Sequence, residues 1–164
     1  REKIKIYTNA ETSKFLLTRF NYLFEKSASS KSYFNPPLEL NNIEYFEELN
    51  INNINIKSIK QNHGAIDTLG FIFNDKFGYC TDVVDFPDIS FNSLYNLKVL
   101  IITGLRESPH LAHAHFDLSF NWIAKLKPDL AYLTHLSPES DHDVVTKLCP
   151  PNVYPAYDGL VIEI

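Results

Sequence analysis

Hydrophobic and polar residues recur with two different periods along the chain. Residues 4–8 (IKIYT) read as a strand, and apolar residues then recur every three or four positions between 16 and 24, which is the spacing of one helical face. Thr8 and Glu11 have the spacing of a capping box, in which each side chain satisfies a free backbone donor. The beginning of the chain therefore predicts a strand and then a helix that ends near Lys26.

Residues 27–42 (SASSKSYFNPPLELNN) interrupt this pattern. The stretch is polar, and Pro36 and Pro37 lack backbone donors and restrain the residues before them. We expect a mobile loop here, and it is the only candidate linker in the sequence.

Strand patterns dominate the middle of the chain. Short alternating runs bounded by turn residues predict three strands, and a run that is apolar on both faces predicts a buried central strand. These four segments are residues 56–62, 68–74, 77–84 and 98–105.

The last part of the chain alternates helix and strand. Asp117 can cap a helix, and residues 130–136 read as another buried strand. A short helix over 140–148 follows, and then a hairpin over 153–164 that turns at Asp158-Gly159. This alternation predicts an α/β layered fold.

Composition agrees with a folded domain and excludes some classes of function. The 164 residues are 45% hydrophobic, enough to build a core, and their net charge of −5 disfavours broad binding to a phosphate backbone. No apolar run approaches the roughly 18 residues of a membrane span, so we expect no membrane insertion.

Cys80 and Cys149 make no disulfide framework and no secretory signal is visible, so we expect a cytoplasmic protein. The chain has no Met and starts at Arg1, which predicts a piece of a longer protein.

Three polar residues stand where predicted apolar strands end, namely His63, Asp82 and His135. Loops at strand ends carry functional groups at a common edge of a sheet, and imidazole and carboxylate are ligands that suit zinc and other first-row metals. Taken singly, each residue also fits a structural role, as a hydrogen-bonded histidine or a turn aspartate. Their joint placement favours a metal site.

A second group of histidines, at His110, His113 and His115, lies just before the predicted helix that Asp117 can cap. The three residues lack the i, i+4 spacing of a helical ligand pair, and the segment reads as a loop. A single histidine that enters the active site as a proton donor is the favoured reading, because the pKa of imidazole lies near neutrality. Cys80 stands inside a predicted strand, which favours a buried, inert thiol over a nucleophile.

Taken in order, seven segments of the sequence resemble the C-terminal half of a metallo-β-lactamase-fold hydrolase. The group they resemble most is that of the cyclic phosphodiesterases similar to the phosphonate-pathway enzyme, and the tRNA 3′-end processing ribonuclease is more distantly similar. The resemblance is close over residues 56–164 and looser over 4–25. The segments are QNHG (61–64), LGFIF (69–73), YCTDVV (79–84), VLIITGLR (99–106), PHLAHAHF (109–116), AYLTHLS (131–137) and PAYDGLVIEI (155–164).

The resemblance implies a fold and a set of site residues. Residues 1–164 would form the C-terminal half of one αββα sandwich, as one mixed sheet with helices on one face. His63 and His135 would be metal ligands, Asp82 would bridge two divalent ions (Zn or Mn), and His115 would assist the leaving group. The family's H-x-H-x-D-H motif, which supplies the other ligands, does not occur in this chain, so we expect the ions to be absent or only partly held here.

The resemblance also implies a function for the intact parent protein. It would be a phosphodiesterase that attacks a small phosphodiester with a two-metal-activated water. Two alternatives stay open: a tRNA 3′-end processing-type nuclease, which the negative charge disfavours, and a catalytically inactive fragment or decayed homologue without metal. One sheet face would lack its usual cover, which predicts a homodimer or another association through that face.

Overall fold

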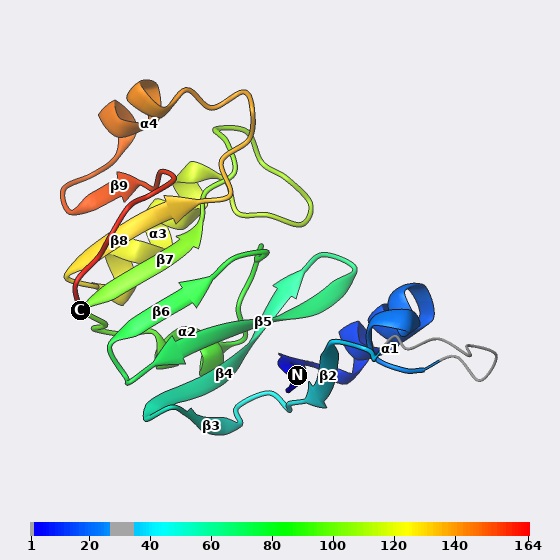
Figure 1. Ribbon diagram of the computed structural model, residues 1–164. Helices are drawn as coiled ribbons and strands as arrows, with labels where there is room; N and C mark the ends of the chain where they lie inside the picture. Colours follow the sequence, from blue (N-terminus) through cyan, green and yellow to red (C-terminus); the bar gives the residue numbers. More distant parts are fainter. Residues whose placement is uncertain (1, 27–34) are drawn as a thin grey trace. The chain divides into compact units, whose positions relative to one another are not determined.

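The computed structural model describes residues 2–26 and 35–164 and divides the chain into two units, Arg1–Tyr45 and Phe46–Ile164 (Figure 1). Each unit has its own sheet. All the candidate site residues lie in the second unit. Among the described residues, no helix is long and apolar enough to cross a membrane.

The first unit pairs two parallel strands beside a helix. β1 (Ile4–Thr8) pairs with β2 (Leu38–Asn42), and α1 (Ala10–Phe20) continues into a 3-10 turn at Asn21–Leu23. The predicted strand and helix are confirmed. The cap is Asn9 and not Thr8, because the Asn9 side chain accepts from the backbone N–H of Thr12 at 2.8 Å.

The predicted loop over 27–42 needs a correction at its end. Residues 27–34 lie outside the described part of the chain, whereas residues 38–42 form β2. Pairing with β1 over five residues supplies the backbone hydrogen bonds that decide this. Tertiary pairing overrides the local turn signals of this segment.

The second unit is built on a seven-stranded mixed sheet in which chain order and spatial order coincide. Neighbouring strands run antiparallel from β3 to β6 and parallel from β6 to β9. The strands are β3 (Glu48–Ile51), β4 (Ile54–His63), β5 (Ile66–Phe73), β6 (Phe77–Cys80), β7 (Val99–Thr103), β8 (Leu130–Thr134) and β9 (Val153–Pro155).

The core lies on the face of the sheet that carries the helices. The helices are α2 (Asp88–Ser93), α3 (Phe116–Leu126) and α4 (His142–Leu148), and α3 lies behind β7 and β8 in Figure 1. Side chains of alternate strand positions, such as Leu100, Ile102 and Leu133, are buried against Trp122 and Leu126 of α3. The predicted α/β layered fold is confirmed.

The opposite face of the sheet carries a row of large side chains. Cross-strand register places one residue from each of β5 to β9 in line, and we call these five the aromatic row: Phe71, Tyr79, Ile101, Tyr132 and Tyr154. Tyr79 is 41% exposed and Tyr154 is 45% exposed. All five side chains are aromatic or aliphatic, and none is charged.

Three sequence predictions in this unit were wrong in detail. The strand expected over 77–84 ends at Cys80. The helix expected to begin at Asp117 has His115 as its cap, so Asp117 lies in its first turn. The hairpin expected over 153–164 does not form, because β9 pairs in parallel with β8 and the described residues after Pro155 carry no strand.

Candidate metal centre

The three residues predicted at strand ends meet at one edge of the seven-stranded sheet. His63 is the last residue of β4, Asp82 follows β6, and His135 follows β8. β4, β6 and β8 run in the same direction, since β4 and β6 are both antiparallel to β5. Their carboxyl ends therefore lie at one edge, and His135 Nε2 comes within 3.8 Å of Asp82 Oδ1.

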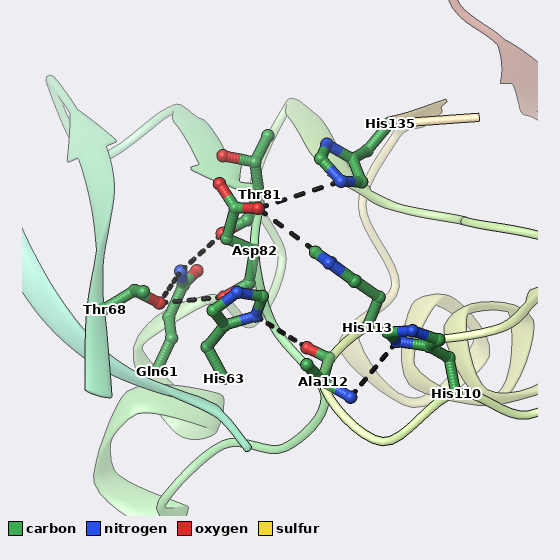
Figure 2. A network of polar contacts seen from close by, with 9 residues as sticks. All are labelled: Gln61, His63, Thr68, Thr81, Asp82, His110, Ala112, His113 and His135. Carbon is green, nitrogen blue, oxygen red and sulfur yellow. Dashed lines mark hydrogen bonds and ion pairs between the residues drawn. The ribbon is translucent and has the colours of Figure 1, made fainter. Parts of the chain in front are cut away.

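A fourth residue, His113, joins this cluster from the loop before α3 (Figure 2). Its Nδ1 lies 3.9 Å from Asp82 Oδ1, and its ring centre lies 4.5 Å from those of both His63 and His135. His63, Asp82 and His113 each offer a ligand atom, and these atoms lie within 4.8 Å of one another. Sequence reasoning noticed His113 only as one of three loop histidines, because no local spacing distinguishes it.

The structure does not bring His115 into the cluster. This residue caps α3, and its carbonyl accepts the backbone N–H of Ser119 at 3.0 Å. In the described part of the chain, no ring pair or ion pair joins it to His63, Asp82 or His135. The predicted catalytic role of His115 stays a prediction, and His113 is the loop histidine that faces the strand ends.

Hydrogen bonds to the backbone of Ala112 and Ala114 hold the loop on both sides of His113. His63 Nδ1 lies 2.8 Å from the carbonyl of Ala112, and the Ala114 N–H donates to the carbonyl of Val83 at 2.7 Å. Gly64 allows the close approach, because its φ is +74° and an added Cβ would lie 3.2 Å from the Leu111 carbonyl oxygen.

The contact with Ala112 also determines the tautomer of the His63 ring, that is, which ring nitrogen carries the hydrogen. A carbonyl oxygen only accepts, so His63 Nδ1 must carry the hydrogen. The lone pair of the neutral ring is then on Nε2. A hydrogen bond of this kind is the usual device that orients a metal-binding histidine.

Burial and charge act together on His113. Burial lowers its pKa, and repulsion from His135 and His63 lowers it further, against the opposing effect of Asp82. Its Nδ1 is buried and has no hydrogen-bond partner among the described residues. The neutral imidazole, which can bind a metal, is therefore favoured.

The donor set fits a divalent ion. The gaps of 3.8 and 3.9 Å from Asp82 Oδ1 to the two imidazoles are too long for hydrogen bonds. Ligand atoms that share one ion at about 2.1 Å each lie roughly 3–4 Å apart. The unpartnered buried Nδ1 of His113 beside a carboxylate is a second sign that this edge suits a cation.

The sequence matches the family described as the beta-lactamase superfamily domain over residues 1–136. The chain belongs to this family. It is also similar to a solved diphosphatase from the PhnP family, with 26% identity and a TM-score of 0.87 over 100% of this chain. No curated protein matches the chain.

Two further solved structures share the fold at lower identity. The metallo-β-lactamase fold protein YhfI from Bacillus subtilis has 16% identity and a TM-score of 0.70, and the match covers 98% of this chain. The short form of human tRNase Z has 13% identity and a TM-score of 0.70 over 100% of this chain. This chain spans 60% of the diphosphatase, 65% of YhfI and 68% of the tRNase.

Proposed function

We propose that this chain contributes part of the metal centre of a hydrolase that cleaves phosphodiester or diphosphate bonds. The observation that carries the proposal is the convergence of three imidazoles and one carboxylate at one sheet edge. Membership of the family and the 26% identity to a diphosphatase support a phosphodiester or diphosphate substrate. Zinc and manganese both suit this donor set.

Each residue has a separate role in this proposal. His63, Asp82 and His135 would hold the divalent ion, which when bound would polarise a phosphoryl oxygen and activate water for attack. The Ala112 carbonyl keeps His63 Nε2 available as a ligand. His113, whose side chain is 14% exposed, would stay neutral and donate a hydrogen bond to the departing oxygen, the role that the sequence suggested for His115.

Titration with Zn²⁺ and Mn²⁺ tests the proposal. The chain has six histidines, and we expect Zn²⁺ to shift the NMR ring signals of His63, His113 and His135. The signals of His115 and His142 should stay in place. Uniform small shifts of all six rings would contradict a defined site.

Two aspartate variants make a matched pair for this titration. Asp82→Asn should abolish the Zn²⁺-induced shifts, whereas Asp75→Asn should keep them. Asp75 is a fair control because it also has a positive φ, 54° against 56° for Asp82, but lies in the turn between β5 and β6. Asp82→Asn should also abolish metal-dependent hydrolysis of bis-p-nitrophenyl phosphate, and Asp75→Asn should retain it. Hydrolysis that survives Asp82→Asn would place the activity at another site.

A further inference from the structure

The backbone of Asp82 has a conformation that needs support. Its φ of 56° lies in the left-handed region, which costs free energy for any residue with a Cβ. Residue 82 also follows β6, which ends at Cys80, so the sheet ladder does not hold it. The direction of its carboxylate therefore depends on other contacts.

Two side chains from neighbouring strands supply those contacts (Figure 2). Gln61 Nε2 donates to the Thr81 carbonyl at 2.8 Å, and Thr68 Oγ1 donates to the Asp82 carbonyl at 2.8 Å. Gln61 Nε2 also lies 3.2 Å from Thr68 Oγ1, and the two residues are directly opposite each other on β4 and β5. Because carbonyls only accept, the hydroxyl of Thr68 must point toward Asp82.

Gln61 is buried at an energetic cost, and a neighbouring glycine leaves the space for its side chain. Gln61 is fully buried, and its Oε1 has no hydrogen-bond partner in the described part of the chain. Burying a carboxamide with an unsatisfied oxygen is unfavourable. Gly70 makes the necessary room, since an added Cβ would lie 2.5 Å from Gln61 Oε1.

The residues beyond Asp82 are held differently. The Val84 N–H donates to the Asn62 carbonyl at 2.8 Å, and the Val83 carbonyl accepts from the Ala114 N–H at 2.7 Å. These are backbone contacts that no side-chain substitution removes. The carbonyls of Thr81 and Asp82, in contrast, accept from the side chains of Gln61 and Thr68.

We propose that Thr68 and Gln61 are positioning residues that hold the Asp82 carboxylate toward His113 and His135. The metal-affinity part of this inference rests on the proposed function, whereas the conformational part does not. Without the Thr68 hydroxyl, the Asp82 carbonyl loses its donor and the left-handed conformation loses one of its two side-chain supports. Contacts of this kind around a metal ligand are typically worth 10- to 100-fold in metal affinity.

Three threonine variants of this chain test the inference. Thr68→Val removes the hydroxyl at nearly constant volume, and Thr68→Ser keeps it. Thr146→Val is the matched control, because it removes an exposed hydroxyl that donates to the His142 carbonyl at 2.8 Å. The two measurements are Zn²⁺ affinity and the Cα and Cβ chemical shifts of Asp82, which differ between a left-handed and an extended backbone.

Thr68→Val should move the Asp82 shifts away from left-handed values and weaken Zn²⁺ binding about tenfold. The shifts of Asn62 and Val84 should stay in place, which a general loss of structure would not allow. Thr68→Ser and Thr146→Val should match the unsubstituted chain in both measurements. Asp82 shifts that do not change in Thr68→Val would overturn the inference.

The two proposals can fail separately. If the unsubstituted chain binds no Zn²⁺, the proposed function fails, and the chemical shifts of Asp82 still decide the positioning role. If Thr68→Val does not fold, Gln61→Met removes the other donor, and the same shift of Asp82 is expected. Unchanged Asp82 shifts in folded Gln61→Met would then reject the inference.

Discussion

His135 Nε2 lies 3.8 Å from Asp82 Oδ1, and both residues adopt left-handed backbone conformations, with φ of 63° and 56°. Each follows one of two parallel-running strands, β8 and β6. A left-handed conformation costs a residue with a Cβ about 1–2 kcal/mol, and aspartate tolerates it better than histidine. Strain of this kind gathers at functional sites, where the side chain matters more than the backbone preference.

A substitution at His135 should therefore separate stability from metal binding. His135→Asn places a residue that tolerates a positive φ, so we expect the free energy of unfolding to stay within about 0.5 kcal/mol. Zn²⁺ affinity should fall, since an imidazole is lost. Urea unfolding and Zn²⁺ titration measure the two effects. A loss of more than about 2 kcal/mol in stability would mean that His135 is mainly structural.

Gly64 should be intolerant of a side chain. In Gly64→Ala, the positive φ and the close contact with the Leu111 carbonyl act together, and we expect a loss of about 2 kcal/mol in the free energy of unfolding. Gly159→Ala is the control, because its φ is +88° but nothing lies within 4 Å of an added Cβ. It should cost about 1 kcal/mol. Equal losses in the two variants would show that the loop contact contributes nothing.

The two cysteines should react at different rates. Burial raises the pKa of the Cys80 thiol far above its usual range, and burial raises the pKa of half-buried Cys149 as well. Since the thiolate is the reactive form, we expect a thiol reagent to label Cys149 slowly and Cys80 only after unfolding. Mass spectrometry of the labelled native and urea-unfolded chain gives the answer. Labelling of Cys80 in the native state would contradict its burial.

The aromatic row should drive self-association of this chain. It runs across five strands, roughly 19 Å at about 4.8 Å per strand, and large apolar faces are rarely left in water. Two copies facing each other would cover both rows at once. Multi-angle light scattering should detect a concentration-dependent dimer, and Tyr132→Lys should shift the equilibrium to monomer.

Lys147→Ala is a suitable control for that substitution, because Lys147 is exposed and lies on α4, outside the strands that carry the row. It should leave the dimer unchanged. A chain that stays monomeric at every concentration would refute self-association through this face.

The metal content of the chain should be at most one divalent ion. His63, Asp82 and His135 offer one set of donors, and three protein ligands hold a single ion in catalytic zinc sites. Weak binding is expected to raise the thermal midpoint in proportion to the logarithm of Zn²⁺ concentration, and EDTA should reverse it. Two tightly bound ions per chain, measured by equilibrium dialysis, would contradict this stoichiometry.

The sequence by itself determined the elements with strong local periodicity and the chemistry at strand ends. The continuous apolar runs at residues 98–105 and 130–136 predicted β7 and β8, and the apolar stripe after residue 116 predicted α3. His63, Asp82 and His135 were visible because each stands where an apolar run stops. Local signals suffice for such features, since side-chain periodicity follows directly from backbone geometry.

Only the tertiary structure decided which further residue joins the three at the strand ends and which segments pair. His113 joins the cluster because Ala112 and Ala114, on either side of it, bond to His63 and Val83, and no sequence pattern encodes those contacts. β2 and β9 likewise form because a neighbouring strand offers backbone partners, against the local turn and hairpin signals. Hydrogen bonds between segments far apart in the chain depend on the packed fold, and local propensity is too weak to determine them.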